Sequence, residues 1–368
     1  MLADKIRMPC IDAAKAVACL LIVLHHLAVY GPMSDYVYPM MTGLIDGLYH
    51  YGRMAVQTFL VIAGFFSAKN LMPFGIPRAV NPLQAIAQRY DRLIVPYLAA
   101  LTLAIICASL ARVWMDHEYI PDAPEIPQLL AHTLLLQDLL DQEALSAGVW
   151  YVAIDFQLFA VTALLLWFAR YRGGQFPAEV IAPVLIGGLT IASLFAFNRN
   201  AVWDETALYF FASYGLGVLA YWAATRRQGV LWLILLGMLV AVALVVEFRV
   251  RIAIAGTVML LLGFARRFAV REDRPELKPL TALGRISYSV FLVHFPLCMV
   301  VNAVFFRFFP NQPLANFLGL VIALIVSIAG GALFFRWVEN HPFRKRVRLP
   351  VLAGFVTSGF FSMLGSGI

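Results

Sequence analysis

The sequence predicts an all-α, polytopic membrane protein, a transmembrane bundle of about ten helices. Hydrophobic residues make up 62% of the 368 residues and charged residues only 13%, whereas a soluble globular chain carries about 25% charged residues. The mean hydropathy is +0.81, and apolar runs long enough to cross a bilayer recur along the chain. The four cysteines lie in apolar runs without metal-ligand spacing, so we expect packing residues and no metal site.

A transmembrane helix needs about 20 mostly apolar residues. We predict spans near residues 10–30, 49–70, 94–114, 149–169, 178–197, 207–224, 230–246, 250–265, 284–307 and 318–338. A weaker apolar segment at 350–364 is either an eleventh span or an interfacial helix. Because no internal repeat or linker divides the chain, we predict one membrane domain over 1–345 and a tail over 346–368.

The distribution of Lys and Arg predicts a cytoplasmic N-terminus, because cytoplasmic loops carry an excess of these residues. The loop 115–148 then faces outward, and it holds seven acidic residues and no Lys or Arg. This asymmetry accounts for the net charge of +7 without a nucleic-acid partner. The cytoplasmic side would hold Lys5, Arg7, Lys69, Arg78, Arg89, Arg92, Arg170, Arg172, Arg226, Arg227, Arg266, Arg267, Arg271, Arg274, Lys278, Arg285, Arg344, Lys345, Arg346 and Arg348.

The first apolar run contains ionisable residues at both ends. Asp12 and Lys15 lie near its start, and His25 and His26 lie about 21 Å further along the helix axis. Charged and titratable groups in a membrane helix are costly and often functional. One interpretation is an i,i+3 ion pair at the interface with histidines capping the outer end. The other makes one histidine a general base, since imidazole titrates near neutral pH.

The segment from Gly52 to Phe65 contains polar residues at the outer end of the second span. Gly64 indicates close helix packing, whereas Arg53 and Gln57 could line a cavity.

Two arginines, Arg89 and Arg92, precede Pro96 and Tyr97 at the cytoplasmic end of the third span. Residues three apart project from one face of a helix, so the two guanidinium groups could clamp a phosphate. The alternative is ordinary positive-inside anchoring.

Two further ionisable residues lie inside predicted spans. Asp155 lies about 8 Å deeper along its helix than Trp150, where it could orient an imidazole or form an ion pair with Arg53 or another buried cation. His294 lies about 15 Å into its span, where it is either catalytic or a helix–helix hydrogen-bond donor. A last polar motif runs from Glu339 to Arg344.

Taken together, five blocks in this order resemble the acyltransferase 3 family of bacterial membrane O-acyltransferases. The resemblance covers residues 11 to about 345. Lys15 and His26 match the family's Arg-x10-His, with Lys in place of Arg. The second block is Val56 to Phe65, with Ala63 in place of Ser, and the third is Arg89, Arg92 and Pro96-Tyr97. The fourth is Trp150 to Phe159, with Asp155 in place of Glu, and the fifth is Leu283 to Pro296.

The resemblance implies transfer of an acyl group, usually acetyl, from cytoplasmic acetyl-CoA or another acyl-CoA to a hydroxyl of a glycan or surface polysaccharide. It implies catalytic roles for His26, Asp155 and His294, and donor binding by Arg89, Arg92, Lys15 and Tyr288. It further implies a multi-pass protein of the bacterial cytoplasmic (inner) membrane that contacts membrane lipid and works with polysaccharide export machinery. His26 and Asp155 would lie in the outer third of the bilayer and the arginines at its inner face.

Two alternatives stay open. Ten spans with buried charges also suit a transporter or flippase of a glycan or lipid intermediate, although no repeated halves are visible. An acyltransferase could also act on a lipid or a small molecule.

Overall fold

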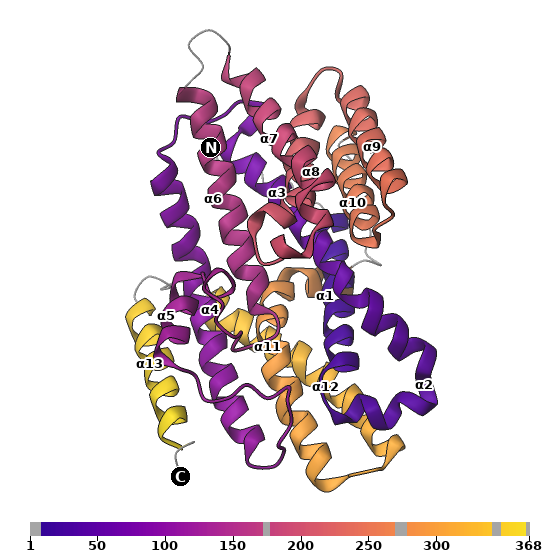
Figure 1. Cartoon of the computed structure of the whole chain (residues 1–368), viewed down its shortest axis with the longest axis vertical. Coiled ribbons are helices and arrows are strands. Elements are labelled where there is room, and N and C mark those ends of the chain that lie inside the picture. Colours follow the sequence, from indigo (N-terminus) through magenta and orange to yellow (C-terminus); the bar gives the residue numbers. More distant parts are fainter. Residues whose placement is uncertain (1–8, 172–176, 269–277, 341–346, 366–368) are drawn as a thin grey trace. The chain divides into compact units, whose positions relative to one another are not determined.

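The structure is a computed structural model, and it describes residues 9–171, 177–268, 278–340 and 347–365. The long elements in these ranges are all helices, and no β-strand occurs in them (Figure 1). The all-α prediction is therefore confirmed. The α-helices are α1 (Pro9–Val29), α2 (Pro32–Tyr51), α3 (Val56–Leu71), α4 (Pro82–Arg112), α5 (Ile126–Leu134), α6 (Val149–Tyr171), α7 (Ala178–Phe195), α8 (Ala207–Thr225), α9 (Gly229–Val246), α10 (Val250–Arg267), α11 (Lys278–Phe308), α12 (Pro313–Phe334) and α13 (Arg348–Gly365). The basic residues predicted at 5, 7, 172, 271, 274 and 344–346 lie outside the described residues, as does most of the motif after Glu339.

Ten helical segments of the described chain are long and apolar enough to cross a membrane. The set differs from the predicted spans in two helices. α10 carries Arg251, Arg266 and Arg267 within 18 residues and is too charged to qualify, whereas α13 qualifies. The segment predicted as an eleventh span or an interfacial helix is therefore one of the ten candidate spans.

The structure also corrects two boundaries. Residues 32–51 form α2, where no span was predicted before residue 49, because Asp35 and Asp46 interrupt its apolar pattern. Helical geometry breaks at Met41, two residues after Pro39. α4 begins at Pro82, well before the predicted span at 94, because a polar amphipathic stretch extends the apolar helix.

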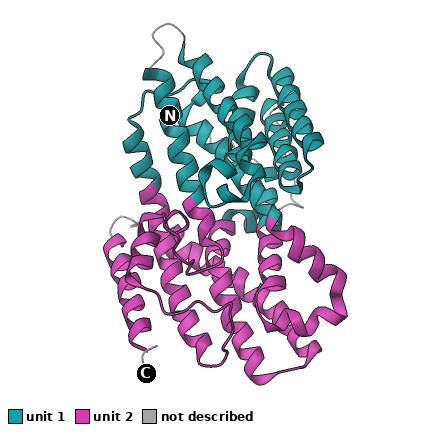
Figure 2. Cartoon of the chain, in the orientation of Figure 1, with its two compact units in different colours: residues 1–18, 54–89, 154–285 teal, residues 19–53, 90–153, 286–368 magenta. Residues whose placement is uncertain are grey.

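The chain divides into two compact units (Figure 2). In unit 1, α8 is the most buried candidate span, and α3, α7 and α10 pack against it. Glycines allow α3 and α8 to touch: a Cβ on Gly64 would lie 2.0 Å from the carbonyl oxygen of Tyr214, and one on Gly217 would lie 2.0 Å from that of Val61. The packing role predicted for Gly64 is confirmed. Unit 1 comprises residues 1–18, 54–89 and 154–285, and unit 2 comprises 19–53, 90–153 and 286–368.

Unit 2 holds the later part of α1 together with α2, α5, α12, α13 and most of α11. Asn302 on α11 accepts a hydrogen bond from the backbone N–H of Met33 (3.3 Å) and donates to the carbonyl of Tyr30 (3.2 Å). This side chain fixes the turn between α1 and α2 against α11. The position of the last turn of α1, where His26 lies, follows from this contact.

Candidate active site

His26 and His294 form a hydrogen-bonded pair in unit 2. α1 supplies His26 from its last turn, and α11 supplies His294. The distance between Nδ1 of His26 and Nε2 of His294 is 2.6 Å, and the two rings are nearly parallel, with an interplanar angle of 4°. His294 is fully buried, and His26 is 8% exposed. The sequence marked both residues as candidates, and the structure brings them together.

The backbone of α11 determines which nitrogens of this pair carry protons. Nδ1 of His294 lies 2.7 Å from the carbonyl oxygen of Phe291 and 3.2 Å from that of Val290. Because a carbonyl oxygen only accepts, Nδ1 of His294 donates, and Nε2 of the neutral ring is then an acceptor. His26 therefore donates from Nδ1, so a neutral His26 has its lone pair on Nε2. Among the described residues, no hydrogen bond reaches that Nε2.

Two aromatic rings lie beside His26. The ring of Tyr30 lies edge-on at a centroid distance of 5.3 Å, and that of Phe295 at 6.4 Å. These rings make the site largely apolar, and a hydrogen bond is electrostatically stronger in such surroundings than in water. The contact between the two imidazoles is therefore well suited to hold His26 in one tautomer.

His25 has a different partner. Its Nδ1 donates to the carbonyl of Leu48 on α2 at 2.8 Å, because successive residues of a helix point about 100° apart. The bare backbone of Gly52 allows this approach, since a Cβ there would lie 2.7 Å from the Cβ of His25. His25 therefore joins α1 to α2, and only His26 faces His294.

Asp155 and Arg89 form an ion pair in unit 1. Their side chains are 6% and 20% exposed, respectively, and the guanidinium also lies over the ring of Phe159 at 5.4 Å. Of the two interpretations of Asp155, a pair with a buried cation is what the structure shows, and the cation is Arg89. Arg53 is exposed. An orienting role of Asp155 toward His26 stays a prediction, as does donor binding by Arg89.

The other predicted donor-binding residues have varied surroundings. Lys15 forms the expected i,i+3 ion pair with Asp12, at 2.7 Å. Arg92 is exposed on α4, one helical turn after Arg89. Tyr288 is half-buried on α11. Their contacts with a donor stay predictions.

Sequence reasoning missed several buried polar contacts. Ser289 donates to the carboxylate of Glu339 at 2.5 Å, which joins the serine motif of α11 to the start of the last polar motif. Gln57, which was expected to line a cavity, accepts from Ser213 of α8 at 2.6 Å. Both serines lie in apolar helices, so only the pairing of helices reveals their partners.

A fourth buried histidine, His132 of α5, was not singled out from the sequence. The hydroxyl of Tyr97 lies 2.8 Å from its Nδ1, and its Nε2 lies 3.3 Å from both the carbonyl of Glu143 and the N–H of Leu145. Burial lowers the pKa of His132 to about 4. Tyr97 is the last residue of the motif that begins at Arg89. Through its contact with His132, it helps to hold the loop 115–148 against α4.

Imidazole proton transfer is the chemistry that this arrangement provides in unit 2. Nε2 of His26 can accept a proton from a hydroxyl, and His294 can stabilise the resulting imidazolium by accepting from Nδ1. Among the described residues, no group of His, Cys, Asp and Glu could hold a metal ion.

The comparisons with known proteins agree with the resemblance. A family model described as an acyltransferase domain, that of the acyltransferase 3 family, matches residues 8–336. The matched range includes His26, Asp155 and His294. No curated protein and no solved structure shows a significant match to this chain.

Proposed function

This chain belongs to the acyltransferase 3 family, and from that premise we propose that it is a membrane O-acyltransferase. It transfers an acyl group, acetyl in the simplest case, from cytoplasmic acyl-CoA to a hydroxyl of a glycan or polysaccharide exported across the bacterial inner membrane. The observation that carries the proposal is the His26–His294 pair, which leaves Nε2 of His26 as a proton acceptor. Family membership favours this activity over a transporter or flippase.

The proposed reaction uses His26 as general base. Nε2 accepts the hydroxyl proton as the acceptor oxygen attacks the thioester carbonyl, so a C–O bond forms and the C–S bond breaks. The proton then passes from His26 to the leaving thiolate, which yields free CoA. Positioned general bases contribute about 10²–10⁴-fold to such rates.

Donor binding is proposed for Arg92 first. Arg92 is an exposed residue, and an arginine fork matches the geometry of a phosphate. Arg89 already contacts the carboxylate of Asp155, so its contribution would be to hold α4 against α6. The glycan class of the acceptor and the acetyl identity of the donor rest on the motifs shared with the family.

The test measures group transfer directly. The purified full chain, in detergent or nanodiscs, is incubated with radiolabelled acetyl-CoA and extracted surface glycans, and labelled glycan and free CoA thiol are quantified. We expect equal amounts of both products from the wild type. His26→Ala should lower the rate at least about 100-fold.

His25→Ala is the matched control, because it removes the neighbouring histidine whose ring faces α2. This variant should retain the rate to within a few-fold. Thiol release that never depends on a glycan would exclude the acceptor class, and a fully active His26→Ala variant would exclude the assigned base.

A further inference from the structure

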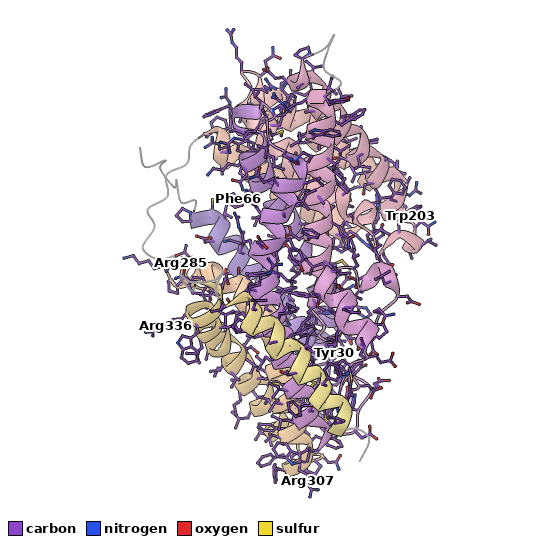
Figure 3. The ribbon with its side chains drawn as sticks, turned by 90° about the vertical axis from the view of Figure 1, so that its left-hand side faces the viewer. Tyr30, Phe66, Trp203, Arg285, Arg307 and Arg336 are labelled. Carbon is purple, nitrogen blue, oxygen red and sulfur yellow. The ribbon has the colours of Figure 1, made fainter. Side chains whose placement is uncertain are left out.

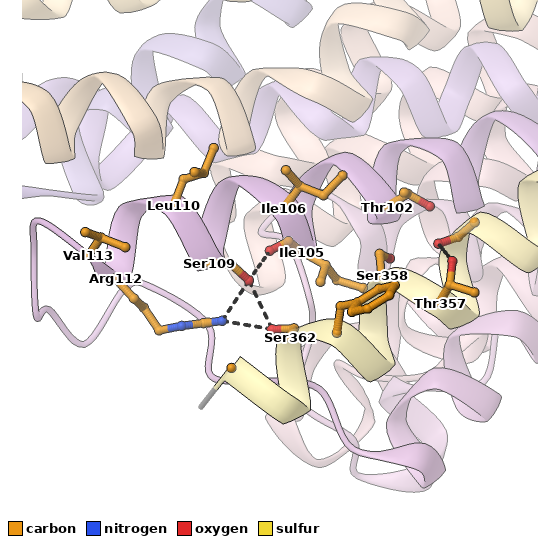
Figure 4. Close-up of a pocket in the computed structure, with 13 residues that line it drawn as sticks. Thr102, Ile105, Ile106, Ser109, Leu110, Arg112, Val113, Thr357, Ser358 and Ser362 are labelled. Atoms are coloured by element: carbon orange, nitrogen blue, oxygen red, sulfur yellow. Dashed lines mark hydrogen bonds between the residues drawn. The ribbon is translucent and has the colours of Figure 1, made fainter. Parts of the chain in front are cut away.

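A groove lies between α4 and α13 in unit 2 (Figure 4), and neither His26 nor His294 lines it. Its volume is about 840 Å³, which is in the range of pockets that bind small molecules. α13 lies beyond the range matched by the family model. The groove is lined by the second half of α4, from Thr102 onward, and by α13 from Gly354 onward.

Most of the groove is suited to an apolar ligand. Ile106, Leu110 and Phe361 are 47%, 54% and 74% exposed, respectively. The hydroxyls of Thr102 and Thr357 donate to backbone carbonyls one turn earlier in their own helices, both at 2.9 Å. These hydroxyl protons therefore need no partner from a ligand, and an alkyl chain could lie against them without leaving a donor unpaired.

One end of the groove is cationic. Arg112 donates to the hydroxyls of Ser109 (3.1 Å) and Ser362 (2.9 Å) and to the carbonyl of Pro121. All of these partners are neutral. Asp122 acts on Arg112 electrostatically, but the two form no ion pair in the described chain. The guanidinium is thus half-buried at the end of an apolar groove and paired only with uncharged groups.

We propose that this groove binds an anionic membrane phospholipid. One acyl chain lies between α4 and α13, and the phosphate contacts the guanidinium of Arg112. Both helices are candidate membrane spans, so the exposed apolar wall faces lipid chains, and Arg112 ends its span, where headgroups lie. Charge decides the class of lipid, because a partly desolvated arginine is best satisfied by a phosphate that it can contact through two N–H groups.

The test is native mass spectrometry of the purified full chain, titrated separately with phosphatidylglycerol and phosphatidylcholine. We expect one phosphatidylglycerol to bind with at least tenfold higher affinity than phosphatidylcholine. Glycerol phosphate, which has the headgroup charge but no chains, should not compete. Complete competition by glycerol phosphate would identify a small-anion site and overturn the proposal.

Two pairs of variants separate charge from shape. Arg112→Gln should weaken phosphatidylglycerol binding about tenfold, whereas Arg307→Gln removes an exposed arginine from the last turn of α11 and should change nothing (Figure 3). Thr357→Trp should block the chain without altering charge. Thr257→Trp on α10 is its control, because Thr257 is also exposed and also donates to a carbonyl one turn earlier at 2.9 Å.

Lipid binding, and not acyl transfer, is the measured quantity, so this inference and the proposed function can fail separately. Unchanged lipid affinity in both Arg112→Gln and Thr357→Trp would overturn the proposal. So would a dimer in which crosslinks from α13 to a second copy show the groove filled by protein. Loss of binding in Thr357→Trp alone supports the groove even if Arg112→Gln does not fold.

Discussion

At the scale of single residues, the candidate site depends on which atom of each side chain is engaged. Two carbonyls of α11 make Nδ1 of His294 a donor, and this determines the tautomer of His26 through a 2.6 Å contact. The guanidinium of Arg89 likewise engages the carboxylate of Asp155, which would otherwise be an unpaired buried charge.

We propose that His294 positions His26, so its replacement should lower turnover more than binding. His294→Phe should reduce kcat about 10²-fold or more with little change in the KM for acyl-CoA, since it removes the acceptor for Nδ1 of His26. His294→Gln should recover part of kcat, because an amide oxygen can accept the same hydrogen bond. Steady-state kinetics of the two variants test this, and equal losses in both would contradict it.

The Arg89–Asp155 pair should matter for stability. Arg89→Ala leaves a buried carboxylate, which typically costs about 3–5 kcal/mol, whereas Arg307→Ala removes an exposed side chain of α11 and should cost less than about 0.5 kcal/mol. Thermal unfolding can be followed with a thiol-reactive dye, because Cys19, Cys107 and Cys298 are buried until the chain unfolds.

The double variant Arg89→Met/Asp155→Leu is the control for this prediction. It removes both charges together, so most of the stability lost in Arg89→Ala should return. If Arg89→Ala unfolds at the wild-type temperature but loses affinity for acyl-CoA, the arginine binds donor and the ion pair is incidental.

At the scale of elements, two features need structure to be recognised: the contact between α3 and α8, and the anchoring of α5. The first depends on glycines that place backbone against backbone. The second depends on a single buried histidine that contacts Tyr97 of α4 and the backbone of the following loop.

Gly64→Ala should destabilise unit 1. The new Cβ would lie 2.0 Å from the carbonyl oxygen of Tyr214, so α3 and α8 must separate, and overpacking of this kind costs about 1–3 kcal/mol or more. Gly188→Ala on α7 is the matched control, because a Cβ there meets no atom within 4 Å. Dye-monitored melting should show a lower unfolding temperature only for Gly64→Ala; equal temperatures would mean that the helices can separate at little cost.

His132 predicts a pH dependence of stability. Burial lowers its pKa from 6.5 to about 4 in the folded chain, so below pH 6.5 the unfolded chain binds more protons. The His132 contribution should therefore decrease as pH falls from about 7 to about 4, by about 3 kcal/mol in total. His132→Gln cannot titrate, so its unfolding temperature should fall less over this range. Parallel curves for the two proteins would contradict the assignment.

At the scale of the whole molecule, the predicted orientation can be tested with single new cysteines. Asp141→Cys lies in the acidic loop and should react with a membrane-impermeant maleimide in intact cells. Arg227→Cys, in the loop between α8 and α9, should react only after permeabilisation. Both positions are exposed, and the wild-type chain measures the background. The reverse pattern would place the N-terminus outside.

Much of the molecule could be predicted from the sequence because the membrane constrains helices strongly. Apolar runs of fixed length indicated most of the spans, and the order of five motifs indicated the family. The same rule missed most of α2, where acidic residues interrupt the apolar pattern.

The sequence by itself determined the fold class and the family, and it singled out candidate residues for the chemistry. Hydropathy and residue type are local properties, so a single chain displays them. Only the tertiary structure decided the partners: His26 with His294, His25 with a backbone carbonyl, and Asp155 with Arg89. His26 and His294 are far apart in the sequence, and their contact depends on how α1 and α11 pack, because helical periodicity leaves the rotation and register of neighbouring helices open.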